Sequence, residues 1–169
     1  MAVVSIKAQE VREADARANF AVDPRTNPLG MVAQHEGEDG SAMFDVIPVN
    51  GETWLVCGGR DFANLAMFES AMGDLVRAMG LPARIIHGGA RGADTMAGSY
   101  AKRHAVELKV YEADWRKHRK AAGPIRNQHM IDAGKPHLVV AFPGGAGTAD
   151  MIRRARTAGV KVAEITPNP

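Results

Sequence analysis

Three short apolar stretches that each end in a pair of glycines constrain the fold of this chain most strongly. The pairs are Gly58 and Gly59, Gly88 and Gly89, and Gly144 and Gly145. Each stretch has the length of a buried β-strand, and each glycine pair is followed by a segment with helical character. Apolar strands that alternate with helices are typical of a parallel sheet covered on both faces. The sequence therefore predicts an α/β fold with three layers and a mainly parallel, five-stranded sheet.

The order of the expected elements follows the apolar pattern and the glycine and proline breaks. The expected strands are 53–57, 84–87, 107–111, 138–142 and 160–165. The expected helices are 64–79, 93–104, 124–133 and 149–158. Between the third strand and the third helix lies a polar, basic connection that contains Trp115.

The first fifty residues differ in character from the rest and form a predicted extension, with the main domain at 51–169. Acidic residues outnumber basic ones in 1–50, whereas the reverse holds afterwards. We expect a helix over residues 11–20, irregular chain over 21–41 and a strand over 43–49. Asn50 and Gly51 are a strong tight-turn signal. They predict a hairpin from this strand into the strand at 53–57.

Composition bounds the class of protein. The chain has 169 residues, of which 46% are hydrophobic, enough for one domain with an extension. Cys57 is the single cysteine, so we expect a reducing compartment and interpret the residue as a buried structural thiol. No apolar run approaches a membrane span, and the start lacks a secretory signal pattern. We expect a cytoplasmic protein with no membrane partner.

The glycine turns point to one site. In a parallel α/β sheet, ligands bind at the carboxyl ends of the strands, where all three glycine pairs are expected to meet. The sequence Pro-Gly-Gly-Ala-Gly-Thr at 143–148 joins a strand to a helix start. Backbone N–H groups in such a turn bind anions, and glycine lets a phosphate approach the backbone closely. This loop is therefore a predicted phosphate site, and the basic character of 51–169 suits an anionic ligand.

From about Thr53 to Ile165 the chain resembles the YspA-like, cpYpsA-related branch of the SLOG superfamily, which joins Lonely Guy phosphoribohydrolases with DNA-processing proteins of the Smf/DprA type. The matching motifs are Gly-Gly-Arg-Asp-Phe at 58–62, His-Gly-Gly-Ala-Arg-Gly-Ala-Asp at 87–94, Ala-Asp-Trp at 113–115, Ala-Gly-Pro-Ile-Arg-Asn at 122–127 with Met130, and Phe-Pro-Gly-Gly-Ala-Gly-Thr at 142–148. The resemblance implies a Rossmann-like sheet of order 3-2-1-4-5 and binding of a nucleotide or nucleotide derivative.

The Lonely Guy enzymes hydrolyse the N-glycosidic bond of nucleoside monophosphates, and their signature is an arginine followed by Pro-Gly-Gly-x-Gly-Thr-x-x-Glu. Arg126 is similar to that arginine, and the loop matches through Thr148, but Met151 stands where the glutamate is expected. A thioether neither takes a proton nor stabilises an oxocarbenium-like centre. Asp150 is adjacent, although one residue on a helix is a rotation of about 100°. The resemblance thus implies a phosphate-binding site in this chain, but it does not imply that the chain catalyses the hydrolysis.

These arguments yield the candidate site residues. Arg126 and Asp150 are the candidate catalytic residues. The candidate ligand-binding residues are Gly58, Gly59, Arg60, Gly88, Gly89, Arg91, Asp94, Arg126, Asn127, Pro143, Gly144, Gly145, Gly147 and Thr148. Asp61 and Asp94 have a second interpretation as helix caps, and we interpret His87 as a core or hydrogen-bonding histidine rather than a general base. No metal site and no cofactor are expected.

Two functions remain open at this point. The first is a small-nucleotide pocket that acts as a ligand sensor or as a phosphoribohydrolase with an altered catalytic residue. The second is a module that binds single-stranded nucleic acid through the basic residues 116–120, with Trp115 interpreted as an anchor to the core. The acidic extension is a candidate for self-association into a homodimer.

Overall fold

A five-stranded parallel sheet forms the centre of the molecule. The computed structural model describes residues 19–21, 30–36 and 42–167. The sheet consists of β4 (Thr53–Cys57), β5 (Arg84–His87), β6 (Glu107–Val110), β7 (Leu138–Ala141) and β8 (Lys161–Glu164). Their order is β6-β5-β4-β7-β8, and every neighbouring pair is parallel. Counted along the chain, this is the predicted order 3-2-1-4-5.

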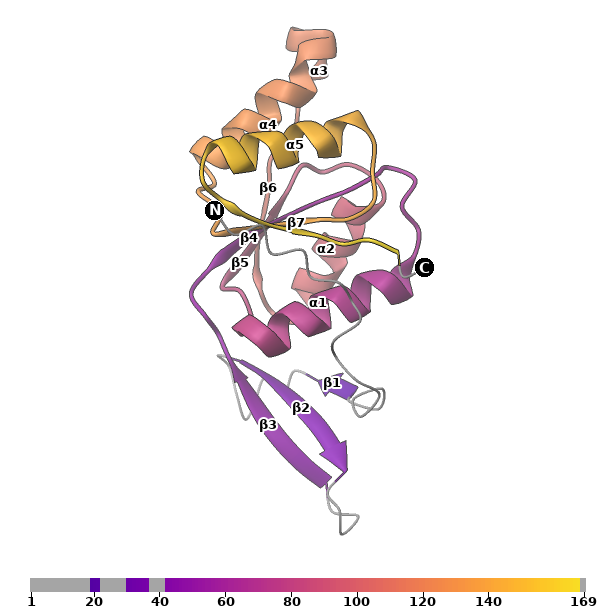
Figure 1. The fold of residues 1–169 in the computed structure, drawn as a ribbon, viewed down its shortest axis with the longest axis vertical. Helices are drawn as coiled ribbons and strands as arrows, with labels where there is room; N and C mark the ends of the chain where they lie inside the picture. Colours follow the sequence, from indigo (N-terminus) through magenta and orange to yellow (C-terminus); the bar gives the residue numbers. More distant parts are fainter. Residues whose placement is uncertain (1–18, 22–29, 37–41, 168–169) are drawn as a thin grey trace.

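Helices cover both faces of this sheet, which confirms the three-layer, Rossmann-like α/β fold (Figure 1). One face carries α1 (Leu65–Met79) and α2 (Ala93–Arg103). The other carries α4 (Ala122–Asp132) and α5 (Ala146–Thr157). The core accordingly divides into two apolar clusters, one on each side of the sheet. None of the described helices is both long and apolar enough to cross a membrane.

The central strand β4 explains why the chain forms this architecture. All five of its residues are buried. Trp54 and Val56 pack into the cluster beneath α1 and α2, whereas Leu55 packs into the cluster beneath α4 and α5. Because successive side chains of a strand point to opposite faces, an uninterrupted apolar run is what a strand covered on both faces requires.

The residues at which the helices begin determine which side chains and backbone amides lie at the carboxyl edge of the sheet. Helix α1 begins after Asn64, whose side chain accepts a hydrogen bond from the Met67 amide at 2.9 Å. Helix α5 begins at Ala146, three residues before the predicted start. Gly147 and Thr148 therefore belong to its first turn and not to a loop. The basic connection forms α3 (Trp115–His118) and a short 3₁₀ turn at Arg119–Ala121.

The chain before residue 50 forms a separate antiparallel sheet of β1 (Asn19–Ala21), β2 (Gly30–Glu36) and β3 (Ala42–Pro48). Strand β3 confirms the predicted strand over 43–49. The predicted helix is wrong at residues 19–20, which lie in β1, and its remainder lies outside the described residues. The prediction of irregular chain over 21–41 is wrong for residue 21, which ends β1, and for 30–36, which form β2. The pairing of β2 with β1 and β3 was not visible in the local pattern.

The predicted hairpin between residues 43–49 and 53–57 is also wrong. Strand β3 pairs with β2, while β4 pairs with β5 and β7. The Asn50 side chain instead accepts a hydrogen bond from the Glu52 amide at 2.9 Å and donates one to the Met79 carbonyl at 3.0 Å. These contacts with the end of α1 direct the chain from one sheet into the other.

Candidate functional site

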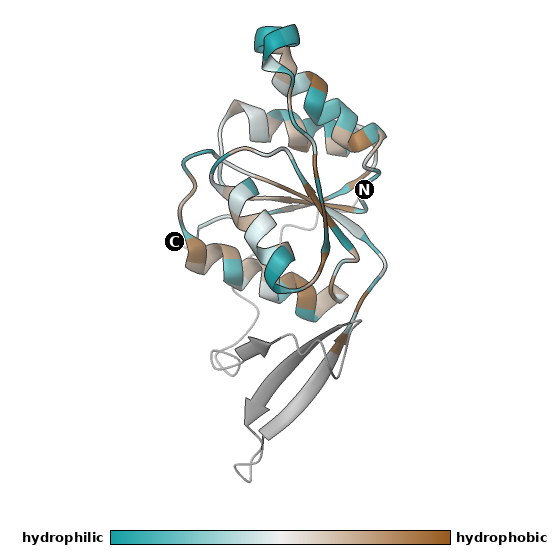
Figure 2. Ribbon diagram, turned by 180° about the vertical axis from the view of Figure 1, so that it is seen from behind, coloured by the Kyte–Doolittle hydropathy of each residue, from teal (hydrophilic) through white to brown (hydrophobic). Residues whose placement is uncertain are grey.

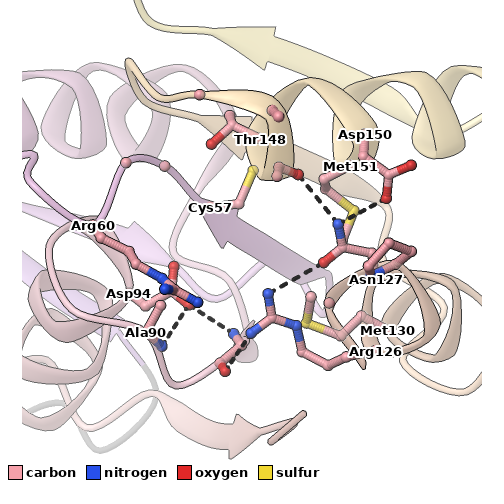
Figure 3. Close-up of a pocket in the computed structure, with 18 of the residues that line it drawn as sticks. Cys57, Arg60, Ala90, Asp94, Arg126, Asn127, Met130, Thr148, Asp150 and Met151 are labelled. Atoms are coloured by element: carbon pink, nitrogen blue, oxygen red, sulfur yellow. Dashed lines mark hydrogen bonds between the residues drawn. The ribbon is translucent and has the colours of Figure 1, made fainter. Parts of the chain in front are cut away.

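A cavity of about 470 Å³ lies where the loops after β4, β5 and β7 meet, at the carboxyl edge of the sheet. Figure 3 shows its walls. It brings together most of the predicted site residues, namely Gly58, Gly59, Arg60, Gly88, Asp94, Arg126, Asn127, Gly145, Gly147, Thr148 and Asp150. Glycine turns that are far apart in the sequence thus line one hollow, as expected for parallel strands.

Four predicted ligand-binding residues do not line the cavity: Gly89, Arg91, Pro143 and Gly144. The Pro143 carbonyl accepts a hydrogen bond from the Gly59 amide at 2.9 Å. A Cβ atom at Gly144 would lie 2.6 Å from the Gly59 nitrogen, so glycine there lets the two turns pack together. The Arg91 side chain is 82% exposed and lies 3.9 Å from Asp61, which is itself on the surface and caps no helix.

The first turn of α5 presents backbone amides to the cavity. Its N-cap, Gly145, makes no side-chain capping bond, and the first N–H groups of a helix have no partner within it. A Cβ atom at Gly145 or Gly147 would meet nothing within 4 Å, and neither residue has a positive φ. Neither packing nor backbone conformation therefore requires glycine at these two positions. Their effect is to keep the positively polarised helix end open to the cavity.

Arg126 reaches the cavity from α4 and is fixed against the loop after β5. Its Nη1 atom donates to the Gly88 carbonyl at 2.6 Å, and a Cβ atom at Gly88 would run into the guanidinium. Its Nε atom is buried and has no hydrogen-bond partner. Burial lowers the pKa of Arg126, and the charge of Asp94 opposes this effect. The guanidinium remains a cation, held in one orientation on the cavity wall.

Asp94 is a buried carboxylate at the start of α2 that, like Arg126, contacts Gly88, and it is 4% exposed. Its Oδ2 atom accepts hydrogen bonds from the Gly88 amide at 3.0 Å and the Ala90 amide at 3.1 Å. Burial raises the pKa of Asp94, while these hydrogen bonds and the charge of Arg126 oppose the rise. Asp94 thus fixes the loop after β5, and the cap of its own helix is Gly92.

Asp150 lines the cavity, but other groups already occupy its oxygens. Oδ2 accepts hydrogen bonds from Asn127 at 3.0 Å and from Arg154 at 2.8 Å, and Oδ1 pairs with Arg153. Burial alone would raise its pKa, but these three partners lower the pKa of Asp150 below its usual range. The residue is therefore a poor proton acceptor at neutral pH.

Three sulfur-containing side chains form the deep wall of the cavity. Cys57, Met130 and Met151 all contribute to it, as Figure 3 shows. Met151 is 1% exposed and lines the cavity, so a thioether stands there in the signature position of a glutamate. Cys57 is buried, as predicted, and burial raises the pKa of its thiol. Sequence reasoning did not foresee that a thiol at the end of β4 also borders the site.

The outer wall includes Trp115, Lys120, Gly123 and Pro124, which sequence reasoning missed. The interpretation of Trp115 as an anchor to the core is wrong, because the residue is 49% exposed and belongs to neither apolar cluster. The signal available was the tryptophan itself, since a large aromatic residue within a polar, basic segment has little core to join.

Two other groups complete the description. The Nδ1 atom of His87 accepts a hydrogen bond from the Gly89 amide at 3.0 Å, and burial lowers the pKa of this histidine to about 4. It is a hydrogen-bonding residue, as predicted. In the part of the chain that the structure describes, no three His, Cys, Asp or Glu side chains gather closely enough to hold a metal ion.

Comparison with known proteins places this site in a family context. Residues 55–118 match the profile of the YspA, cpYpsA-related SLOG family. The chain is also 33% identical over 122 residues to the Gene 61 protein of Mycobacterium phage D29, an alignment that covers 68% of this chain and 97% of that protein. The match to the family includes the turns after β4 and β5 together with Asp94 and Trp115.

Proposed function

The chain belongs to the YspA, cpYpsA-related SLOG family, and we propose that its cavity binds a nucleotide or nucleotide derivative through a phosphate at the start of α5. The observation that carries this proposal is the open helix terminus. Gly145 and Gly147 have neither a packing reason nor a conformational reason to be glycine. Close approach of an anion to the amides of this turn supplies a reason.

The charges around the cavity support the same class of ligand. Arg60, Lys120 and Arg126 all line it. Of the two lining carboxylates, Asp150 is neutralised by two arginines and Asp94 is held by backbone amides. A guanidinium such as that of Arg126 suits phosphate oxygens through charge-assisted hydrogen bonds. A cavity of about 470 Å³ has the size of a small-molecule site.

Ligand sensing fits the site better than the standard phosphoribohydrolase reaction. That reaction needs a carboxylate near the glycosidic carbon, and Met151 occupies the signature position. Asp150 is engaged by Asn127, Arg153 and Arg154. The arrangement therefore offers phosphate binding without a free catalytic carboxylate on α5.

Gly147→Ala tests the proposal. Alanine has room at this position in the ligand-free protein, so the substitution should raise the free energy of unfolding by roughly 0.4–1 kcal/mol. Its methyl group should nevertheless hold a phosphate away from the amides and weaken the binding of AMP, GMP, CMP or UMP at least tenfold. Calorimetric titration and urea unfolding measure the two effects.

Ser99→Ala, on the exposed face of α2, is the matched control and should change neither quantity appreciably. Equal affinity of wild type and Gly147→Ala for every nucleotide that binds would contradict a phosphate at this turn. If chromatography detects free base released from a nucleoside monophosphate, and Arg126→Ala abolishes that release, the protein is a hydrolase and the sensing proposal is wrong.

A second candidate function is binding of single-stranded nucleic acid. The observation in its favour is the exposure of Arg116, Lys117, Arg119 and Lys120 on α3 and the following turn. This end of the molecule projects from the sheet and is hydrophilic (Figures 1 and 2). Affinity for an oligonucleotide that falls steeply with salt would support it, and the absence of binding at low salt would rule it out.

A further inference from the structure

The outer wall of the cavity contains a cation–π pair of side chains that phosphate binding does not explain. The guanidinium carbon of Arg60 lies 5.5 Å from the centre of the Trp115 ring. Arg60 comes from the glycine turn after β4, and Trp115 begins α3. Two segments far apart in the sequence therefore meet at the cavity, and both residues are exposed to solvent.

Trp115 is held in place although it is only half-buried. Asp114 accepts a hydrogen bond from the Lys117 amide at 2.9 Å, which caps the short helix that carries the indole. A Cβ atom at Gly123 would lie 3.5 Å from the Trp115 ring, so the ring rests beside the first turn of α4. The other tryptophan, Trp54, is fully buried in the core. The indole of Trp115 thus packs against the first turn of α4 on one side, and part of its surface lines the cavity.

The turn after α3 brings a cation back to the same wall. Arg119 adopts φ 46° and ψ −126°, a conformation with positive φ that is unfavourable for a residue other than glycine and persists where the surroundings enforce it. The next residue, Lys120, lines the cavity. The cavity that Trp115 lines therefore has a lysine on its wall as well.

We propose that Trp115, with Arg60, is the base-recognition end of the site, so that the ligand is an intact nucleotide whose base stacks on the indole. This inference rests on the proposed function, which places the phosphate at α5. An indole ring beside a guanidinium suits a flat heteroaromatic group, because both offer a planar face for stacking. The larger ring system of a purine covers more of the indole than a pyrimidine does.

The test compares AMP, ribose 5-phosphate and inorganic phosphate in calorimetric titrations of the full chain. Trp115→Ala should weaken AMP binding roughly tenfold to a hundredfold and leave the affinity for ribose 5-phosphate unchanged. Trp115→Phe, which keeps an aromatic face, should restore much of the AMP affinity. Lys117→Ala is the control on the same helix, since Lys117 does not line the cavity, and should bind AMP like wild type.

Tryptophan fluorescence gives an independent reading. Acrylamide should quench Trp115 and spare the buried Trp54, and AMP should protect Trp115 from the quencher whereas ribose 5-phosphate should not.

The outcomes separate the two proposals. AMP affinity that Trp115→Ala leaves intact and Gly147→Ala weakens would overturn the base-recognition role while the phosphate site stands. Equal affinity for AMP and ribose 5-phosphate would overturn it as well. No binding of these three compounds to wild type, and none of GMP, CMP or UMP, would overturn both proposals. An oligonucleotide that binds more tightly than AMP, with Lys117→Ala weakening it, would favour a nucleic-acid strand.

Discussion

Gly88 and Arg126 act as a unit, because the absence of a side chain at one residue is what gives the other its position. The Gly88 carbonyl accepts from Arg126 at 2.6 Å, its amide donates to Asp94 at 3.0 Å, and a Cβ atom would occupy the place of the guanidinium. One glycine therefore positions both a cation and a carboxylate of the cavity.

Gly88→Ala should displace the Arg126 guanidinium, lower the free energy of unfolding by roughly 1–3 kcal/mol and weaken nucleotide binding. Urea unfolding and calorimetric titration measure these effects. In an Arg126→Ala background the same substitution should cost much less, because the group it collides with is gone. Equal costs in the two backgrounds would show that the collision is not the cause.

His87 makes stability depend on pH in a defined direction. Its pKa in the folded protein, about 4, lies below the ordinary value of 6.5. Between pH 4 and pH 6.5, His87 is therefore mostly protonated in the unfolded chain and mostly neutral in the folded protein. The contribution to stability is complete above pH 6.5 and is lost as the pH falls towards 4.

Between pH 7 and pH 5 this effect should lower the free energy of unfolding by roughly 1–2 kcal/mol. His87→Gln removes the titrating group and should reduce that difference, as urea unfolding at the two pH values will measure. Burial also lowers the pKa of His104, so His104→Gln is a useful comparison. If the free energy of unfolding of His87→Gln depends on pH as strongly as that of wild type, His87 is not the cause of the acid sensitivity.

At the scale of elements, the start of α5 is held by its neighbour α4. Asn127, which is 3% exposed, donates to the Gly147 carbonyl at 3.2 Å and to Asp150 at 3.0 Å. Arg154 bonds Asp150 and also donates to Gln128 at 2.6 Å. The two helices therefore form one support for the proposed phosphate turn.

Asn127→Ala should lower the free energy of unfolding by roughly 1–3 kcal/mol, because it removes the two hydrogen bonds that this buried side chain donates to α5. It should also weaken nucleotide binding by loosening the first turn of α5. Gln128→Ala, one residue away and exposed, should change stability by about 0.5 kcal/mol or less. A similar loss in both variants would show that the buried position of Asn127 is not decisive.

The elements themselves show what local sequence can and cannot predict. The inner strands β4 and β7 were predictable because burial on both faces leaves an uninterrupted apolar run. The start of α5 was placed late because its first turn contains Gly147, a weak helix former. The hairpin predicted at Asn50 does not form, because the Asn50 side chain contacts Met79 at the end of α1. A local sequence pattern contains no information on such a contact.

At the scale of the whole molecule, the topology explains why the site was largely predictable. Parallel strands deliver their carboxyl ends to one edge, so the three glycine turns had to be close in space. The outer wall was not predictable in this way. Trp115 and Lys120 reach the cavity through α3 and the turn at Arg119, whose direction depends on tertiary packing rather than on the sheet. The antiparallel sheet of β1, β2 and β3 was likewise missed, because the length and pairing of β2 are set by its partners.

The central claim is that a phosphate sits on the amides of the first turn of α5. The most direct test is a ¹⁵N–¹H correlation spectrum of the full chain, titrated with AMP. We expect the largest saturable shifts at the amides of Gly145, Gly147 and Thr148, with smaller shifts around Gly88 and Trp115. Saturable AMP binding that leaves those three amides unshifted would contradict the account.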